Sequence, residues 1–191
     1  MLQLAEIFYS IQGEGAFTGT PAVFVRLAGC NLSCDFCDTD YSLKFFASVD
    51  EVVARVRELG GSCPMVILTG GEPLAQRETI DLIDALRRDG RRVHIESNGT
   101  MFAQLPQDVW LCVSPKERPD PRMIARANEL KLIVDDRVPE EWLAQAGESQ
   151  VLLLQPEGNK PKNVALALEY VKAHPARLRL SLQTHKLIGV P

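Results

Sequence analysis

Three cysteines lie close together in the segment GCNLSCDFCDTDYS, which starts at Gly29. Their C-x3-C-x2-C spacing, from Cys30 through Cys34 to Cys37, lets three thiolates converge on one small inorganic cluster without long-range folding. A 4Fe-4S cluster normally takes four cysteine ligands. Three ligands leave one iron open, and an open coordination site indicates chemistry rather than structural support, as it does for zinc. We therefore interpret the three cysteines as ligands of a catalytic 4Fe-4S cluster.

A structural zinc site is the alternative interpretation of these cysteines, and it needs a fourth ligand. The candidates are Cys63, Cys112, His94 and His185. None of them has the spacing of a zinc finger. We expect Cys63 and Cys112 to be small core residues, because Cys112 lies within a predicted strand and Cys63 directly precedes a proline.

A second motif, TGGEP, ends the predicted strand Met65–Thr69. Its two glycines allow the backbone to approach a ligand closely, and Glu72 offers an acceptor to an ammonium group. A Gly-Gly pair at a strand end is usually only a turn. This pair, however, comes one strand–helix unit after the cysteine loop, and that position favours a ligand-binding loop.

Short apolar runs alternate with helical patterns, and this alternation predicts a parallel sheet. The runs are Ala22–Ala28, Met65–Thr69, Arg92–Glu96, Val109–Val113, Leu130–Val134, Val151–Gln155 and Leu178–Leu182. They are rich in Val, Ile and Leu, as strands covered on both faces are. The predicted helices are Val49–Leu59, behind a Ser48/Glu51 capping box, and Gln76–Asp89, Arg122–Asn128, Pro139–Gln145 and Asn163–Ala173.

The fold class that these patterns predict is α/β. A complete eightfold barrel typically needs about 250 residues, and this chain has 191. We therefore expect a single domain over residues 1–191, built as a partial, open parallel βα barrel of about six units with trimmed helices. Three later strand ends are polar, as in the sites of such folds: Glu96–Gly99, Ser114–Lys116 and Gln155–Gly158. For Glu96 and Asn98, an ordinary polar turn is an equally good interpretation.

The composition narrows the classes of protein that fit. The net charge is −4, which gives no support for a nucleic-acid surface. No apolar run approaches the roughly 20 residues of a membrane span, and the first twelve residues do not form a signal peptide. Five cysteines, three of them clustered, are a poor disulfide framework. We expect a cytoplasmic protein that binds neither nucleic acid nor membrane.

The cysteine loop after the first barrel strand, followed by TGGEP, resembles the radical S-adenosylmethionine (SAM) superfamily. The resemblance implies that SAM binds the open iron through its amino and carboxylate groups. It also implies that Phe36 lies near the adenine and that Gly71 and Glu72 meet the methionine amino group. The SAM contacts that it implies are Phe36, Cys37, Asp38, Gly71, Glu72, Ser114, Pro115, Lys116, Gln155, Pro156, Glu157 and Gly158.

The flanking segments resemble one family of that superfamily, the 7-carboxy-7-deazaguanine synthases of queuosine-type (7-deazapurine) biosynthesis. The motifs occur in order along nearly the whole chain: IQGEG, CDTDYS, LTGGEPL, ESNGT, SPK, LQPEG and QTHKLIGVP. The resemblance implies a lyase that converts 6-carboxy-5,6,7,8-tetrahydropterin to 7-carboxy-7-deazaguanine with loss of ammonia, using SAM catalytically. It also implies one 4Fe-4S cluster per subunit, Mg²⁺, a flavodoxin- or ferredoxin-like one-electron reductant and a homodimer.

The same resemblance assigns a substrate segment, 1–20, a cluster loop, 29–42, and a closing tail, 183–191. Glu14 would pair with the guanidine-like edge of the pterin. The hydroxyl of Thr39 would bind Mg²⁺. The substrate contacts that the resemblance implies are Ile11, Gln12, Gly13, Glu14, Arg26, Thr69, His185 and Pro191. Arg26 would bind the substrate carboxylate through its planar fork, and without the resemblance a solvent-facing charge on a strand would be the alternative.

Two other functions stay open. A glycyl-radical activase is also a short radical SAM protein, but its substrate is a glycine loop of another protein, and it gives no reason for the QGEG segment or for Arg26. A non-enzymatic metal or electron-transfer module would bind iron or zinc with four ligands and would not cleave SAM.

Overall fold

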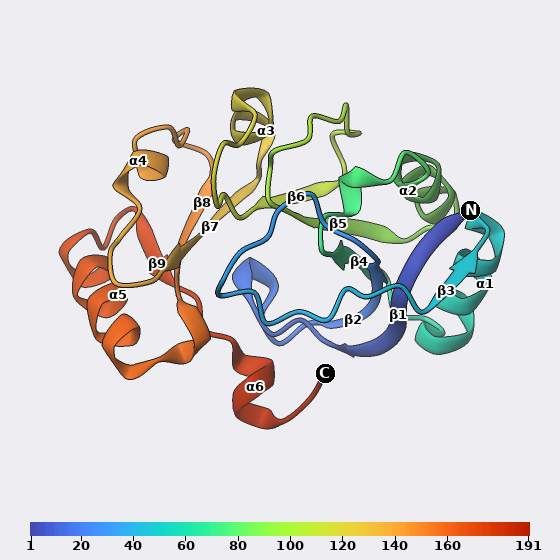
Figure 1. Ribbon diagram of the computed structural model, residues 1–191, viewed down its shortest axis with the longest axis horizontal. Coiled ribbons are helices and arrows are strands. Elements are labelled where there is room, and N and C mark those ends of the chain that lie inside the picture. Colours follow the sequence, from blue (N-terminus) through green and yellow to red (C-terminus); the bar gives the residue numbers. More distant parts are fainter. The chain divides into compact units, whose positions relative to one another are not determined.

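Nine strands carry the fold, which the computed structural model describes for residues 1–191 (Figure 1). They are β1 (Leu2–Ile11), β2 (Pro21–Leu27), β3 (Phe45–Ala47), β4 (Met65–Gly70), β5 (Arg92–Ser97), β6 (Trp110–Val113), β7 (Glu129–Val134), β8 (Val151–Pro156) and β9 (Leu178–Leu180). The pairs β2–β4, β4–β5, β6–β7, β7–β8 and β8–β9 are parallel, whereas β1 and β3 pair antiparallel. The predicted α/β fold with an open, mostly parallel sheet is confirmed.

The chain divides into two compact units and passes between them at several points, one of them within β1 and one within β6. The first unit comprises Met1–Ser10, Pro21–Ser97 and Met101–Leu111; the second comprises Ile11–Thr20, Asn98–Thr100 and Cys112–Pro191. The strand order is β3-β1-β2-β4-β5 in the first unit, and β7, β8 and β9 follow β6 in the second. Because β3 and β9 each have a neighbour on one side only, the sheet is open. The single domain expected for the whole chain stays a prediction.

Helices connect the parallel strands. They are α1 (Val49–Gly60), α2 (Thr79–Arg88), α3 (Pro121–Arg126), α4 (Glu140–Leu143), α5 (Pro161–Ala173) and α6 (Thr184–Ile188), with short 3-10 turns η1 (Gly15–Phe17), η2 (Pro73–Ala75) and η3 (Glu157–Asn159). None of the helices combines the length and the apolar character that crossing a membrane requires.

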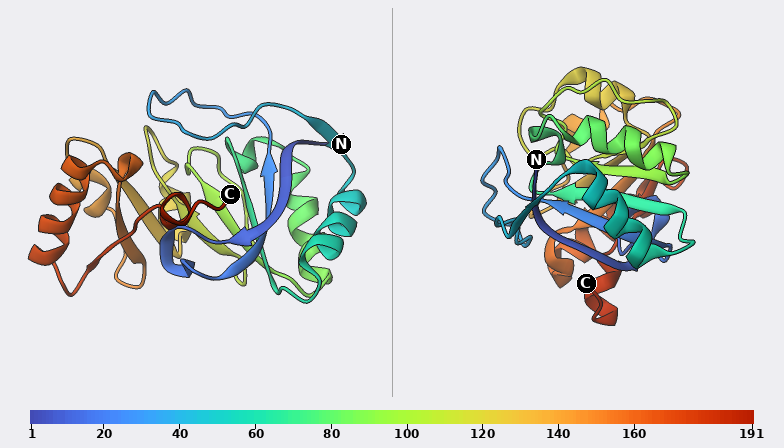
Figure 2. Two further views of the ribbon diagram at one scale, coloured as in Figure 1. Left: turned by 90° about the horizontal axis from the view of Figure 1, so that it is seen from below. Right: turned by 90° about the vertical axis from the view of Figure 1, so that its right-hand side faces the viewer.

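In the first unit, α1 and α2 pack side by side and contact β2 and β5 (Figure 2). The predicted capping box opens α1: the Ser48 hydroxyl oxygen accepts from the Glu51 amide at 3.3 Å, and Glu51 accepts from the Ser48 amide at 2.7 Å. The residues that this helix buries, Val52, Val53 and Val56, recur at helical spacing. Apolar periodicity therefore decides which side of α1 is buried.

The helix α2 begins at Thr79, three residues later than the predicted start at Gln76. Gln76 is extended, with φ −99° and ψ 125°. Its side-chain amide accepts from the Gln3 backbone N–H at 2.8 Å and donates to the carbonyls of Gln3 and Ala28 at 2.9 and 3.0 Å. The residue thus links β1 to the end of β2, and this tertiary contact overrides the helical pattern of its own segment.

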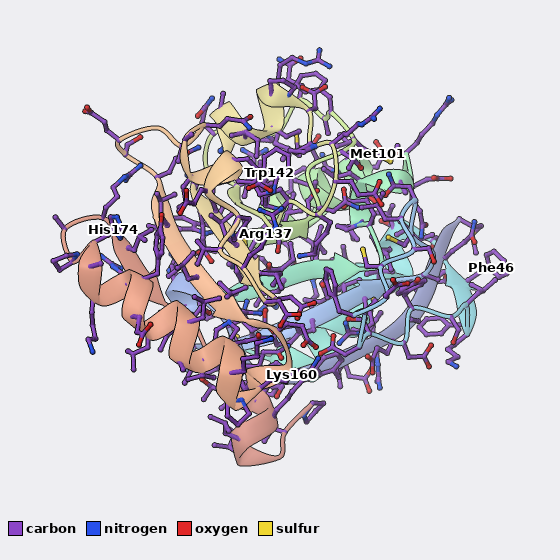
Figure 3. All side chains as sticks on the ribbon, turned by 60° about the vertical axis from the view of Figure 1, so that its left-hand side comes forward. Phe46, Met101, Arg137, Trp142, Lys160 and His174 are labelled. Atoms are coloured by element: carbon purple, nitrogen blue, oxygen red, sulfur yellow. The ribbon has the colours of Figure 1, made fainter.

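In the second unit, α5 packs on β7, β8 and β9. Lys160 and His174 mark the two ends of this helix (Figure 3). Because successive side chains of a strand point to opposite faces, Leu130 and Leu132 of β7 share one face, and Glu129 and Lys131 share the other. The polar face of β7 is the one that the candidate site uses.

Three elements lie outside the predicted set: β1, β3 and α6. Gln3 and Glu6 interrupt the apolar residues of β1, so no apolar run marks this strand. The strand β3 has three residues and α6 has five, which is too short for a periodic pattern to be read from the sequence.

Candidate active site

The cysteine loop leaves the C-terminal end of β2 and reaches β3 without regular secondary structure of its own (Figure 2). Its two ends are fixed to β1, since the amides of Ala28 and Lys44 donate to the carbonyls of Gln3 and Leu4, both at 2.9 Å. Inside the loop, the Gly29 amide donates to the Tyr41 carbonyl at 3.0 Å and the Cys37 amide donates to the Cys34 carbonyl at 3.1 Å. The predicted position, a loop at the carboxyl end of the first parallel strand, is confirmed by the element order.

The three cysteines of this loop lie around Tyr41. Negative charge on Cys37, burial, and charge on Cys30 and Cys34 all raise the pKa of the Tyr41 hydroxyl. Cys30 and Cys34 are half-buried, Cys37 is exposed, and none of the three is in a disulfide. No group of three His, Cys, Asp or Glu side chains in the structure is arranged as a metal site. Three thiols on one irregular loop fit an iron–sulfur cluster, and they must converge further to ligate it.

The TGGEP loop packs directly against the start of the cysteine loop. Leu27 of β2 pairs with Gly70 of β4, and the Glu72 amide donates to the Gly29 carbonyl at 3.1 Å. A Cβ atom on Gly71 would lie 2.2 Å from the Gly29 oxygen and 2.5 Å from the Cys30 Cβ. Only glycine fits at position 71, because no real Cβ contact is so short. Two motifs that are 40 residues apart in the sequence are thus joined in space.

The carboxylate of Glu72 is completely buried. It accepts from the Leu74 amide at 3.0 Å and so caps the η2 turn. The Ser97 hydroxyl donates to both of its oxygens, at 3.0 and 3.1 Å. These contacts hold the TGGEP loop against the end of β5. Sequence reasoning did not single out Ser97, although it lies in the polar ESNG strand end.

Arg26 and Thr69 are register partners on β2 and β4, so their side chains share a face of the sheet. The Arg26 Nε donates to Glu6 Oε1 at 2.5 Å, and its guanidinium lies 5.7 Å from the centre of the Phe8 ring. Phe8 in turn stacks on Phe24, with ring centres 4.9 Å apart. The Arg26 side chain is 20% exposed. It is therefore positioned by β1 but not closed off from a ligand.

The remaining predicted residues of the first unit belong to the cysteine loop. Phe36 and Thr39 are half-buried and Asp38 is exposed. All three lie within two residues of Cys37, so a ligand held by that thiolate is within reach of each of them. Their predicted roles toward SAM and Mg²⁺ stay predictions.

In the second unit, Glu14 is the centre of a polar network. Lys131 Nζ lies 2.7 Å from Glu14 Oε2, and Gln183 Nε2 donates to Glu14 Oε1 at 3.0 Å. Burial raises the pKa of Glu14, but the Lys131 ammonium and hydrogen bonds from Lys131, Gln155 and Gln183 lower it to about 2. Glu14 is therefore an ionised, partly buried acceptor at neutral pH.

The segment that carries Glu14 is fixed by its backbone. The Gly15 amide donates to the Ser181 hydroxyl oxygen at 3.0 Å, and the Ala16 amide donates to Glu129 Oε2 at 3.1 Å. The Ser181 hydroxyl donates onward to Gln155 Oε1 at 2.9 Å. Gly15 has a φ of +73° and lies so close to Glu129 that a side chain would collide with it. The QGEG segment is thus bound to the first residue of β7 and to the residue that follows β9, rather than left as a free turn.

The C-terminal tail packs on the same segment. The Thr184 amide donates to the Gly13 carbonyl at 2.9 Å. A Cβ atom on Gly13 would lie 2.2 Å from His185 Nδ1, so the imidazole occupies the space above this glycine. The Val190 amide donates to the His185 carbonyl at 3.1 Å and turns the chain back toward Pro191. His185 is therefore next to the predicted substrate segment.

The other predicted strand ends also lie in the second unit. Lys116 Nζ donates to the Ser114 oxygen at 2.5 Å, and the Ser114 hydroxyl donates to the Lys131 carbonyl at 2.8 Å. Gln155 belongs to the Glu14 network, and Gly158 has a φ of +58° in the η3 turn. The Asn98 side chain accepts from the amide and hydroxyl of Thr100, at 2.9 and 2.7 Å, which is the pattern of a polar turn.

Sequence reasoning missed four polar residues of the second unit: Glu129, Lys131, Ser181 and Gln183. The segment ELKL at residues 129–132 alternates charged and apolar residues. This alternation is typical of a strand with one polar face, and it could have indicated Glu129 and Lys131. Gln183 is the first residue of the closing tail, 183–191, which the resemblance implied as a whole. The sequence holds no comparable signal for Ser181.

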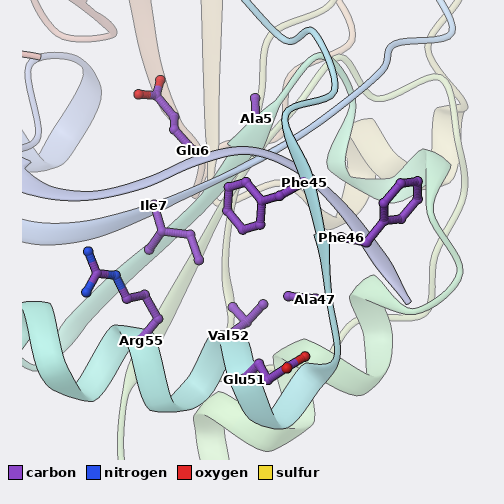
Figure 4. Close-up of a pocket in the computed structure, with 9 residues that line it drawn as sticks. All are labelled: Ala5, Glu6, Ile7, Phe45, Phe46, Ala47, Glu51, Val52 and Arg55. Atoms are coloured by element: carbon purple, nitrogen blue, oxygen red, sulfur yellow. The ribbon is translucent and has the colours of Figure 1, made fainter.

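The first unit also contains a cavity of 500 Å³ between β1, β3 and α1 (Figure 4). Its lining includes Phe45 and Phe46 of β3 and Arg55 of α1. None of the residues that line it is a predicted contact of the cluster, SAM, Mg²⁺ or substrate. The cavity is therefore separate from the residues that the cysteine and TGGEP loops bring together.

The class of protein follows from comparison with known families. The profile of the Radical SAM superfamily matches residues 24–138, which include both the cysteine loop and the TGGEP loop. A 7-carboxy-7-deazaguanine synthase of Bacteroides thetaiotaomicron is 41% identical over 100% of this chain and 99% of its own length. Another, of Burkholderia multivorans, is 38% identical over 97% of each chain.

A solved structure agrees with the sequence comparisons. The crystal structure of QueE from Escherichia coli superposes with a TM-score of 0.84 at 31% identity, over 96% of this chain and 94% of that one. The chain belongs to the 7-carboxy-7-deazaguanine synthase family of radical SAM enzymes. The cofactors of this class are a 4Fe-4S cluster and SAM.

Proposed function

We propose that this chain converts 6-carboxy-5,6,7,8-tetrahydropterin to 7-carboxy-7-deazaguanine, with loss of ammonia and without net consumption of SAM. The observation that carries the proposal is the ionised carboxylate of Glu14, which the second unit holds on the QGEG segment. An electron-transfer module or a metal-storage site needs no such acceptor. A pterin, in contrast, presents a row of N–H donors that a buried carboxylate binds well.

The first unit supplies the residues for the cofactors. Cys30, Cys34 and Cys37 hold the cluster, and the absent side chain of Gly71 lets the TGGEP loop pack against Gly29 and Cys30, beside the cluster ligands. When bound, the cluster and SAM together supply the one-electron chemistry that removes a hydrogen atom from the substrate. The residues that we assign to SAM are Phe36, Cys37, Asp38, Gly71 and Glu72 in the first unit, and Ser114–Lys116 and Gln155–Gly158 in the second.

The substrate residues act by binding and orientation. In the second unit, Glu14 accepts from the donor edge of the pterin, and Gln12, Gly13, His185 and Pro191 enclose that edge. In the first unit, Arg26 binds the carboxylate. Glu6 uses one of the five N–H donors of the Arg26 guanidinium, so the other donors can serve a carboxylate.

Replacing Arg26 with alanine is expected to raise KM for the pterin about 10- to 100-fold, because hydrogen bonds between charged groups contribute about 1.5–3 kcal/mol. The affinity for SAM should stay unchanged. Steady-state kinetics over a range of pterin concentrations measures the effect. Arg55→Ala is the control, since Arg55 lies on α1 and pairs with Glu58 at 2.6 Å. An unchanged KM in the Arg26 variant would rule out its role toward the carboxylate.

We assign Mg²⁺ to the Thr39 hydroxyl, together with substrate oxygens and water, because Mg²⁺ usually keeps several waters and few protein ligands. Thr39→Ala is expected to raise the Mg²⁺ concentration for half-maximal activity about tenfold or more. A titration of activity with Mg²⁺ measures this change. Ser62→Ala, which removes an exposed hydroxyl outside the cluster loop, is the control. Identical titration curves for the two variants would exclude Thr39 as a ligand.

The decisive experiment is anaerobic reconstitution of the cluster, followed by incubation with the pterin, SAM, Mg²⁺ and a reductant. We expect 7-carboxy-7-deazaguanine by mass spectrometry, one ammonia per product and no loss of SAM. A glycyl-radical activase would instead consume SAM only with a protein substrate. An electron-transfer module would show an electron paramagnetic resonance spectrum that SAM does not change.

We further infer that a flavodoxin- or ferredoxin-like protein supplies the electron and that the chain acts as a homodimer in the cytoplasm. None of its five cysteines is in a disulfide, which supports a reducing compartment. Sedimentation of the reconstituted protein tests the homodimer.

A further inference from the structure

The carboxylate of Glu14 accepts hydrogen bonds from two parts of the second unit, the sheet and the C-terminal tail. From the sheet, Lys131 of β7 donates to Oε2 at 2.7 Å. From the C-terminal tail, Gln183 donates to Oε1 at 3.0 Å, and Lys186 Nζ donates in turn to Gln183 Oε1 at 2.9 Å. The Lys131 side chain is only 7% exposed and that of Glu14 is 17% exposed. The ion pair is therefore shielded from water and oriented on both sides.

We propose that Lys131 is a positioning residue of the substrate site, whose ammonium binds the Glu14 carboxylate and aims it at the donor edge of the pterin. This inference rests on the proposed function and adds a residue that acts through Glu14 rather than on the substrate itself. It also gives a reason for a lysine in the interior of a strand, where an unpaired charge is costly.

The backbone of Lys131 is rigid enough for such a role. The residue lies within β7 and pairs with Leu153 of β8 in the parallel ladder. Its carbonyl accepts the Ser114 hydroxyl at 2.8 Å. A long lysine side chain that starts from a strand fixed on its neighbours can hold its ammonium at one point. Sites supported by regular elements in this way are held more closely than sites on loops.

The carboxylate keeps capacity for a substrate. An ionised carboxylate offers about four lone-pair sites, and Glu14 receives side-chain hydrogen bonds from Lys131, Gln155 and Gln183. At least one site is left for a pterin N–H. Protonation of Glu14 would turn one of its acceptor positions into a donor. The ionised form is therefore the better acceptor for a pterin N–H.

The surroundings show which group keeps Glu14 ionised. Burial raises its pKa, and the Lys131 charge is the largest influence that lowers it. The other titratable or charged groups that face the segment are Glu129 on β7, and His185 and Lys186 on the tail. The Glu129 side chain accepts from the Ala16 amide at 3.1 Å. Lys186 donates to Gln183, which donates to Glu14, whereas Lys131 donates to the Glu14 carboxylate directly.

The test compares Lys131→Met, which removes the charge, with Lys131→Arg, which keeps it, in the reconstituted holoenzyme. Lys131→Met is expected to raise KM for the pterin at least about tenfold at pH 8 and more at pH 6, while kcat changes less than about threefold. Lys131→Arg should restore KM to within about fivefold of the wild type. Lys162→Met is the control, since Lys162 is an exposed lysine of the same unit that pairs with Asp136.

Two further variants keep the inference testable if Lys131→Met folds poorly. Glu14→Gln and Glu14→Gln/Lys131→Met both remove the buried negative charge. The double variant therefore removes Lys131 without leaving a carboxylate that has lost its ammonium partner. If Lys131 acts through Glu14, the two should have KM values within about threefold of each other. A much higher KM in the double variant than in Glu14→Gln would overturn the inference. An equal rise in KM for the pterin in Lys131→Arg and Lys131→Met would also overturn it.

The test of Lys131 and the test of the proposed function can fail independently. Wild-type turnover of the pterin with an unaffected Lys131→Met variant overturns only the role of Lys131. Absence of wild-type turnover overturns the proposed function instead. In that case a ¹³C NMR titration of the Glu14 carboxyl, in the wild type and in Lys131→Arg, still tests whether Lys131 acts on Glu14. A Glu14 that titrates above pH 5 in the wild type would contradict it.

Discussion

Alanine in place of Cys30, Cys34 or Cys37 is expected to abolish product formation and to remove the iron–sulfur absorption of the reconstituted protein. In the proposed assignment each thiolate is one of only three protein ligands, and we expect the two that remain not to hold a 4Fe-4S cluster. Iron and sulfide analysis, together with the electron paramagnetic resonance spectrum after reduction, measures cluster loss apart from activity.

The matched control for this series is Cys63→Ala. Cys63 is buried, and its thiol donates to the Pro21 carbonyl at 3.3 Å, outside the cysteine loop. Its loss should cost about 1 kcal/mol of stability and leave the cluster intact. A full cluster in any of the three loop variants, or four protein ligands around the metal, would contradict the assignment of an open iron.

Gly71→Ala is expected to lower activity about 100-fold or more. Its Cβ would lie 2.2 Å from the Gly29 carbonyl oxygen, so either the TGGEP loop or the cysteine loop must move. Displacement of a reacting group by about 1 Å can cost about 100-fold in rate. The measurements are kcat for the pterin and the affinity for SAM in the reconstituted protein.

Gly147→Ala is the matched control for Gly71→Ala, because neither glycine has a positive φ. The nearest atoms to a Cβ on Gly147 belong to Gln150 and lie 3.8 Å away, in ordinary contact. The control should therefore keep full activity. Normal turnover in Gly71→Ala would mean that the two loops do not need their close approach.

The residues that we assign to the cofactors come from local motifs. The three cysteines are neighbours in the sequence, and Gly71 follows a strand whose partner carries the cysteine loop. The fold class was predictable for a similar reason, because apolar runs and helical periods alternate along the chain. The exact start of α2 could not be predicted from the sequence, because it depends on the contact between Gln76 and Gln3.

The partners of the predicted substrate residues are set by tertiary structure. Lys131 is 117 residues from Glu14, and Gln183 is 169 residues away, so spacing along the chain carries no sign of either pair. Arg26 was predicted to meet a carboxylate, but its pairing with Glu6 depends on how β1 lies against β2. A resemblance can name such residues, yet it does not say what keeps them ionised or oriented.

The contacts of the QGEG segment have a consequence for biosynthesis of the protein. Gly15 is bound by Ser181, 166 residues later, and Glu14 by Gln183. The segment leaves the ribosome early, but the residues that fix it emerge near the end of translation. Such long-range pairings form late, because a long loop must close first. A nascent chain can therefore assemble its cysteine loop well before it is able to recognise a pterin.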